Sequence, residues 1–245
     1  MTLRLRDLPS PNHDPRPGGE PVDTLVLHYT GMRTAGEAIS RLRAPESRVS
    51  AHYVVEEDGA VWRLVPEERR AWHAGVSHWR GRAGLNGRSI GIEVVNPGHE
   101  WGYRPFPALQ MAAVCELCLD ILARRPGIAT RDVVAHSDVA PDRKQDPGEL
   151  FDWEGLAANG VGLWPRGVAG GDPGAPEPDG AAEPPGAAER ASALLGAIGF
   201  RTDLPPAVLA AAFQRHWRPE RVDGRLDPGT LARMAAVAAL AADSR

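Results

Sequence analysis

Two histidines and an aspartate have the residue types of a catalytic zinc site. His28 ends the apolar run Asp23–His28, His136 ends a second apolar run, Asp132–His136, and Asp146 follows ten positions later. A polar side chain at the end of a buried strand lies where α/β sheets usually place active-site groups. A single histidine at the end of a strand would more often be a core residue. The presence of two such histidines together with Asp146 is what favours a metal site. Two imidazoles and one carboxylate bind zinc and leave a fourth position for water or substrate, which is typical of catalytic rather than structural sites.

Glu93 and Lys144 are candidates for acid/base and electrostatic roles. Lys144 precedes Asp146 by two positions, so in an extended segment both side chains point to the same side. A cation beside a metal ligand would be repelled by the metal, unless it serves to stabilise a tetrahedral oxyanion. Glu93 lies in an otherwise apolar strand, where a carboxylate is costly to bury unless it is paired or protonated. Near the metal it could act as a general base and then protonate a leaving amine. An outward-facing edge position is the alternative for Glu93.

The elements that must position these residues alternate between β-rich and helical patterns. Asp58-Gly59 separates two β-rich runs and favours a hairpin with a type I′ turn. Helical patterns cover 34–43 and 107–124, and Pro126-Gly127 ends the second. Strands interleaved with helices predict an α/β fold with a central mixed β-sheet flanked by helices. The β-rich runs are 23–28, 53–57, 60–65, 89–95 and 132–136.

The C-terminal third has a different composition. Residues 166–190 contain five Pro, six Gly and six Ala and no aromatic residue, so they cannot bury enough apolar area to offset the entropy of ordering. We expect a flexible linker at 166–189 that lets two domains move independently, a catalytic domain at 1–165 and a small three-helix domain at 190–245. The three helical runs are Arg190–Gly199, Pro205–Trp217 and Leu231–Ala242.

Composition excludes several classes of protein. The 245 residues carry a net charge of −4, with 28 basic and 32 acidic side chains, so nucleic acid is not an expected partner. The mean hydropathy is −0.31 and no apolar run approaches the length needed to cross a bilayer. Oligomeric state is not readable from these patterns.

The two cysteines, Cys115 and Cys118, form a C-x-x-C pair. Two thiols are too few for a disulfide framework or a thiolate-only zinc site. Redox pairs open a helix, where the dipole lowers the thiol pKa, whereas this pair lies in the middle of a helical run. We therefore expect reduced, packed side chains rather than redox chemistry.

Five motifs, in order between Ser10 and Trp164, resemble the zinc-dependent N-acetylmuramoyl-L-alanine amidases, whose fold is shared with peptidoglycan recognition proteins and the T7-type lysozyme amidase. The resemblance implies that His28, His136 and Asp146 hold Zn²⁺, that Glu93 is the catalytic acid/base and that Lys144 stabilises the transition state. It also implies hydrolysis of the amide between N-acetylmuramic acid and L-alanine, with a muropeptide or peptidoglycan as substrate. The motifs are LVLHYTGM from Leu25, SAHY from Ser50, RAWHAG from Arg70, Asn86 with SIGIE from Ser89, and the segment from His136 to Gly148 that includes APDRKQDPG.

Further polar and aromatic residues are candidates for substrate binding. An aromatic and imidazole cluster could stack on a sugar or line a cleft, and two asparagines could hydrogen-bond N-acetyl or peptide amides. His52 is either a partner that orients a metal ligand or a plain core residue. The cluster consists of Trp72, His73 and Trp79, and the asparagines are Asn86 and Asn96.

The C-terminal run resembles the three-helix peptidoglycan-binding domain through Ala212-Phe213-Gln214 and the segment Val222–Leu231. The first Asp-Gly turn of that family is shortened here, near Gly199. A structural or partner-docking helical unit is therefore the alternative.

Three alternatives concern the activity and its location. A non-catalytic peptidoglycan sensor of the same fold would be expected to lack a zinc ligand, and all five site residues are present. A zinc peptidase that cuts between amino acids shares the same metal chemistry.

Met1–Ser10 is charged but has no following apolar segment, so we expect no secretory signal, a cytoplasmic location and soluble anhydro-muropeptides as substrates in cell-wall recycling. A periplasmic amidase acting on wall peptidoglycan is the alternative, and the C-terminal unit favours it.

Overall fold

A mixed sheet forms the centre of the first part of the chain. The computed structural model describes residues 5–18, 21–166 and 182–244. Within those residues the central sheet has six strands in the order β1-β5-β4-β9-β3-β10, with β4 and β5 antiparallel and the other neighbours parallel. The predicted mixed sheet is confirmed. Its strands are β1 (Leu5–Asp7), β3 (Thr24–Tyr29), β4 (Tyr53–Val55), β5 (Val61–Arg63), β9 (Ser89–Val94) and β10 (Val133–Ala135).

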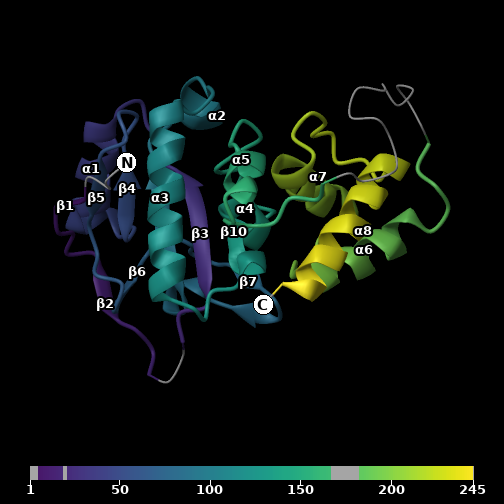
Figure 1. Cartoon of the computed structure of the whole chain (residues 1–245), viewed down its shortest axis with the longest axis horizontal. Coiled ribbons are helices and arrows are strands. Elements are labelled where there is room, and N and C mark those ends of the chain that lie inside the picture. Colours follow the sequence, from purple (N-terminus) through teal and green to yellow (C-terminus); the bar gives the residue numbers. More distant parts are fainter. Residues whose placement is uncertain (1–4, 19–20, 167–181, 245) are drawn as a thin grey trace.

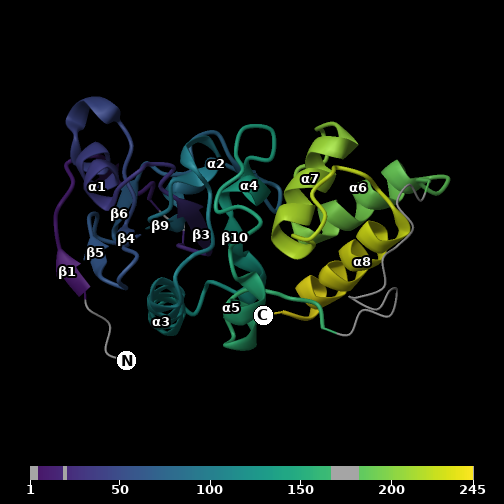
Figure 2. The same cartoon turned by 90° about the horizontal axis from the view of Figure 1, so that it is seen from above.

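Short β-ribbons and helices surround this sheet. Seen from above, α3 and α1 lie on opposite sides of it (Figure 2). The ribbons pair β2 (His13–Pro15) with β6 (Arg69–Ala71), and β7 (His78–Trp79) with β8 (Arg82–Ala83). The helices are α1 (Ala35–Arg43), α2 (Gly98–Trp101), α3 (Ala108–Arg124), α4 (His136–Val139) and α5 (Trp153–Ala158).

Strand alternation decides which side chains face the site. Leu25 and Leu27 pack with α3 in one core, so Val26 and His28 lie on the opposite face of β3. The parallel register of β3 and β9 pairs His28 with Glu93. The two polar residues at the ends of these buried strands therefore share the face away from α3.

The hairpin between β4 and β5 is present but has a different turn. A type I′ turn needs a positive φ at both central residues, and only Gly59 has one, at 83°. The Gly59 amide donates to the Glu56 carbonyl and the Glu56 amide donates to the Ala60 carbonyl. The loop is thus one residue longer than a type I′ turn, and Gly59 takes the left-handed position that ends it.

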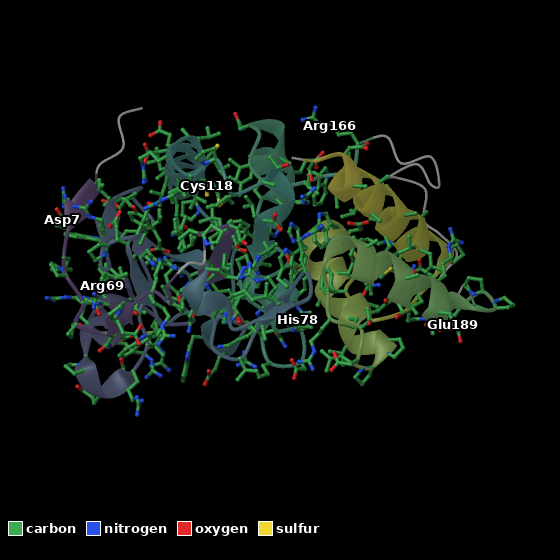
Figure 3. The ribbon with its side chains drawn as sticks, turned by 90° about the horizontal axis from the view of Figure 1, so that it is seen from below. Asp7, Arg69, His78, Cys118, Arg166 and Glu189 are labelled. Carbon is green, nitrogen blue, oxygen red and sulfur yellow. The ribbon has the colours of Figure 1, made fainter. Side chains whose placement is uncertain are left out.

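Both cysteines are free and lie in α3 (Figure 3 labels Cys118). Cys118 is fully buried in the core that joins α3 to the sheet, and Cys115 packs against the same core. Burial raises the pKa of both thiols, which disfavours the reactive thiolate. The arrangement fits packed side chains and not a redox pair.

The C-terminal part consists of α6 (Ala187–Ile198), α7 (Pro206–Trp217) and α8 (Pro228–Asp243), which lie together at one end of the molecule (Figure 1). Helix α6 begins three residues earlier than the predicted helical domain. Residues 167–181 of the predicted linker lie outside the described residues.

The helical part packs directly on the α/β part. Val26, Val134 and Val139 share a core with side chains of all three C-terminal helices. Across the junction, the Arg80 amide donates to the Gly199 carbonyl over 2.8 Å. The two parts share one core in this structure, so the expectation that they move independently does not hold for it.

Across the described ranges, no helix has the length and apolar character needed to cross a bilayer.

Candidate active site

Three buried side chains converge in the way the sequence predicts. Nδ1 of His28 lies 2.9 Å from Nδ1 of His136, and Oδ2 of Asp146 lies 3.1 Å and 2.9 Å from these two nitrogens. The three residues are between 1% and 6% exposed, and their candidate ligand atoms all lie within 4.8 Å of one another. The cluster is therefore able to hold a metal ion.

The fold brings these residues together from three elements. His28 is the fifth residue of β3, and His136 is the first residue of α4, directly after the adjacent parallel strand β10. The predicted strand therefore ends one residue before His136. The backbone amide of Ser137 donates to the carbonyl of Asp146 over 3.0 Å, which ties the segments carrying two of the three side chains.

The hydrogen bond of His136 to Ala74 fixes its tautomer. Nε2 of His136 lies 3.2 Å from the Ala74 carbonyl oxygen. A carbonyl can only accept, so the imidazole proton must be on Nε2. In the neutral ring this leaves Nδ1 with a free lone pair that points at the cluster.

His28 is oriented by a chain of hydrogen bonds that ends on a carbonyl. The Ser89 hydroxyl donates to the Leu85 carbonyl over 2.7 Å, so its oxygen is left to accept from Nε2 of His73 over 3.1 Å. Nδ1 of neutral His73 then accepts from Nε2 of His28 over 3.0 Å. The chain leaves Nδ1 of His28 unprotonated and facing the cluster.

Close packing holds His73 in this chain. Its ring lies on Gly91 of β9, where an added Cβ would come within 2.4 Å of the imidazole. Glycine at this position leaves room for the ring between the sheet and the cluster.

Electrostatics favour the metal-binding protonation states of two cluster residues, His28 and Asp146. Burial, and then the proximity of His136, lower the pKa of His28 to about 4. Burial opposes ionisation of Asp146, but the two histidines outweigh it and hold the pKa of its carboxyl far below the ordinary value. A neutral imidazole and an ionised carboxylate are the forms that bind a divalent cation.

Glu93 and Lys144 line the cavity that opens over this cluster. The cavity has a volume of about 690 Å³ and reaches Glu93, His136, Lys144 and Asp146. Burial, and next the Asp146 carboxylate, raise the pKa of Glu93 well above its ordinary value, and Lys144 opposes this. Oε2 of Glu93 is buried without a hydrogen-bond partner among the described residues. A carboxyl that can hold a proton therefore borders a candidate metal site and a cation.

Comparisons with known proteins decide the family. A family model described as N-acetylmuramoyl-L-alanine amidase matches residues 18–149, which is more than half of the chain. The chain belongs to the N-acetylmuramoyl-L-alanine amidase family. It is an enzyme that hydrolyses the amide between N-acetylmuramic acid and L-alanine of the stem peptide.

Two curated relatives from Escherichia coli differ in how much of this amidase they match. N-acetylmuramoyl-L-alanine amidase AmiD is 37% identical over 235 residues, which cover 86% of this chain and 80% of AmiD. The 1,6-anhydro-N-acetylmuramyl-L-alanine amidase AmpD is 38% identical over 165 residues, which cover 60% of this chain and 87% of AmpD.

Solved structures show the same fold. A complex of E. coli AmiD with the substrate anhydro-N-acetylmuramic acid-L-Ala-D-γ-Glu-L-Lys superposes with a TM-score of 0.76 at 36% identity, and covers 90% of each chain. AmpDh3 from Pseudomonas aeruginosa in complex with an anhydromuramic pentapeptide gives a TM-score of 0.71 at 31% identity, and covers 90% of this chain and 92% of that one.

The predicted substrate-binding residues of the amidase separate into two groups. Trp72 and His73 line the cavity. Trp79 does not: it is fully buried against Phe200 of the helical part, and its indole donates to Asp132. Its assignment to the substrate cleft is wrong because this indole is used in the packing between the two parts.

The predicted asparagines bind the protein's own backbone. Oδ1 of Asn86 accepts from the amides of His73 and Ala74 over 3.1 Å and 2.8 Å, which holds the loop that presents these two residues. Asn96 is 1% exposed and donates to the carbonyl of Arg104. In this structure neither side chain lines the cavity, so the expected direct contact with substrate amides is not supported.

His52 is fully buried, and its side chain forms a hydrogen bond with the backbone of β9. Its Nδ1 accepts from the Gly91 amide over 3.0 Å, and its Nε2 lies 3.1 Å from both the Arg16 guanidinium and the Arg69 carbonyl. The partner that orients His28 is His73, whereas His52 lies one ring further away, with its centroid 5.7 Å from that of His73.

Several cavity residues were not identified from the sequence, among them an arginine and a tryptophan. Arg41 of α1 and the half-exposed Trp101 of α2 line the same cavity. The available signal for Trp101 was a tryptophan within a Gly- and Pro-rich segment, and Arg41 had none beyond its place on a polar helix face.

Proposed function

We propose that this amidase binds one Zn²⁺ through His28, His136 and Asp146 and uses Glu93 and Lys144 in the hydrolysis. The observation that carries the proposal is the convergence of three buried donor atoms below a cavity bordered by Glu93 and Lys144.

The donor set suits zinc. Two imidazole nitrogens and one carboxylate oxygen are ligands that zinc prefers, and three protein ligands leave one position for water or substrate. Both imidazoles are oriented by hydrogen bonds at their far nitrogens, as in known zinc sites. When bound, the ion would polarise the scissile carbonyl and lower the pKa of water in the open position.

Glu93 would move the proton in this reaction. Its raised pKa lets the carboxyl take a proton from the attacking water and hold it until the amine of L-alanine leaves. The buried, unpartnered Oε2 lies ready to accept that proton. Lys144 would donate a hydrogen bond to the oxyanion that develops on the lactyl carbonyl.

Trp72 and His73 would contact the substrate. Trp72 is half-buried at the cavity, where its indole offers a flat apolar surface to a sugar or to the stem peptide. His73 borders the cavity while it orients His28.

The proposed substrate is a soluble anhydro-muropeptide, and the proposed role is cell-wall recycling. The support comes from relatives that are named 1,6-anhydro-N-acetylmuramyl-L-alanine amidases or that bind anhydromuramyl peptides in crystals. We place the reaction in the cytoplasm, with the periplasm as the alternative compartment. Cell fractionation tests the compartment, and faster release of peptide from intact sacculi than from soluble fragments would favour action on the wall.

The proposed domains are a catalytic domain at 1–165, a linker at 166–189 and a peptidoglycan-binding-like domain at 190–245. Binding of the full chain to sacculi in the absence of turnover tests the last of these.

Glu93→Gln tests the proposed chemistry. The variant keeps the shape of the side chain but cannot take up a proton, so we expect one zinc per chain as in the wild type and a loss of hydrolysis of about 10³-fold. Mass analysis of the products from a muramyl-tripeptide should show cleavage before L-alanine. Retained turnover in the variant, or cleavage after L-alanine in the wild type, contradicts the proposal.

A further inference from the structure

A buried contact between Asp138 and His216 joins the two parts of the molecule beside the candidate metal site. Asp138 lies on α4, two residues after His136, and His216 lies on α7 of the helical part. Nδ1 of His216 is 2.7 Å from Oδ2 of Asp138, and neither side chain is exposed to solvent. Helices α4 and α7 are neighbours in both views of the chain (Figures 1 and 2).

The same carboxylate oxygen fixes the start of α4. Oδ2 of Asp138 accepts from the backbone amide of Ala135 over 2.8 Å. Ala135 is the last residue of β10, and His136 is the first residue of α4. The Asp138 carboxylate therefore closes the turn that sets the backbone of His136.

This turn also forms a hydrogen bond with the segment that carries Asp146. The Ser137 amide donates to the Asp146 carbonyl. A displacement of α4 would consequently move His136 and Asp146 together relative to His28, which belongs to β3.

His216 is itself held in one position. Its ring stacks on Trp153 at 3.8 Å between centroids and on Trp217 at 3.6 Å, with interplanar angles of 25° and 6°. Oδ1 of Asp138 and Nε2 of His216 have no hydrogen-bond partner among the described residues. The contact between the two side chains thus depends on the single bond at Oδ2.

We infer that His216 is a positioning residue, through which the helical part holds α4 so that His136 and Asp146 face the metal site. The inference rests on the proposed function, because it takes these two residues as zinc ligands. The helical part is then a structural component of the active site, whatever glycan it binds.

Two substitutions in the full chain separate the hydrogen bond from the ring packing. His216→Phe keeps the stacked ring and loses the donor, whereas His216→Asn keeps a donor near the position of Nδ1 and loses the stack. We expect zinc affinity, measured by competition with a chromogenic chelator, to fall about tenfold in His216→Phe and to stay within about twofold of the wild type in His216→Asn. The absorption spectrum of the Co²⁺-loaded protein should change in the first variant only.

Arg80→Ala is the matched control. It removes the hydrogen bond from the Arg80 guanidinium to the Ile198 carbonyl, a contact between the two parts, and the 3.9 Å ion pair of Arg80 with Asp132; neither contact involves α4. Zinc affinity should be unchanged in this variant. Wild-type affinity and cobalt spectrum in His216→Phe, or an equal loss of affinity in Arg80→Ala, overturn the inference. Failure of the wild type to bind zinc would instead refute the proposed function.

A double variant keeps the test available if His216→Phe does not fold. Asp138→Ala combined with His216→Phe leaves no unpaired buried carboxylate, so it avoids the main cost of the single change. It should also bind zinc about tenfold more weakly than the wild type, and wild-type affinity in it contradicts the inference.

Discussion

Both polar atoms of the Gln214 side chain in the helical part have hydrogen-bond partners, whereas the network around His28 leaves potential metal-ligand atoms beside a cavity. In the helical part, Gln214 is fully buried, accepts from the amides of Asp223 and Gly224, and donates to Thr230. These bonds hold one loop in place. In the α/β part, the chain from His28 through His73 and Ser89 is just as complete but ends at a nitrogen that points into the cluster.

The difference shows that buried polar residues can either stabilise the fold or form a site for a metal ion. A closed network stabilises a fold because every buried polar atom has a partner. A network that leaves lone pairs facing one another is costly unless a cation or a proton joins them. Within the described residues, such a convergence of metal-binding side chains occurs at His28, His136 and Asp146. Chemistry is therefore expected there, and stability alone from the loop around Gln214.

Asp227→Ala gives the largest expected loss of stability in the helical part. Asp227 is fully buried, caps α8 through the Thr230 amide and contacts Arg218. Burial raises the pKa of this carboxyl, but the hydrogen bonds from Thr230 and Arg218 outweigh it, so the net pKa is lowered. Removing the carboxylate leaves a buried cation with one partner fewer, so the free energy of unfolding should fall by about 3–5 kcal/mol.

Chemical denaturation measures this loss, and hydrolysis per folded molecule should stay as in the wild type. Asp203→Ala, which removes an exposed partner of Arg201, is the control and should leave stability unchanged. A fall in kcat for Asp227→Ala at full folding would show that the two networks are not separate.

The pH dependence of stability tests the buried histidines. Burial, and then the charge of Arg16, lower the pKa of His52 to about 3 in the folded state. The unfolded chain, with a pKa of about 6.5, takes up the proton first. The stability contributed by neutral His52 is thus fully present above pH 6.5 and is lost as the pH falls toward 3, by on the order of 3 kcal/mol at pH 4.

His52→Asn checks the assignment, since its amide oxygen can still accept from the Gly91 amide but does not titrate. Denaturation curves between pH 4 and pH 8 should give a flatter dependence for this variant. An unchanged slope would place the proton uptake on other groups.

His73→Phe has the smallest expected change in free energy of these variants. It tests one hydrogen bond, the one that orients His28 for zinc binding. The phenyl ring preserves the packing on Gly91 but cannot accept from Nε2 of His28. Zinc affinity should fall about 10–100-fold in a competition titration. His52→Asn, a change in the same imidazole cluster, should retain wild-type affinity, and equal losses in both variants would show that neither bond is specific for the metal ligand.

The cluster itself was predictable from the sequence, because it depends on local rules. Apolar runs that end in a polar residue place His28 and His136 at the ends of parallel strands, and the spacing of Lys144 and Asp146 keeps both near them. The mixed sheet followed from the hairpin signal beside interleaved helices.

The orienting residues were not predictable, because they depend on contacts between distant segments. His73 can orient His28 only because of the position of β9 and because Gly91 has no side chain in the way of the imidazole ring. Neither condition can be read from a single stretch of the sequence. Trp79 was misassigned because a buried and a substrate-facing tryptophan look alike in sequence. The linker composition likewise says nothing about whether the helices beyond it pack on the sheet.

A crystal structure of the zinc-loaded protein, with anomalous scattering measured at the zinc edge, tests the central claim most directly. The hydrogen bonds of His28 and His136 predict a single peak at the base of the cavity, bound by Nδ1 of both histidines and by Oδ2 of Asp146. A peak elsewhere in the chain, or coordination through Nε2 of either histidine, would contradict it.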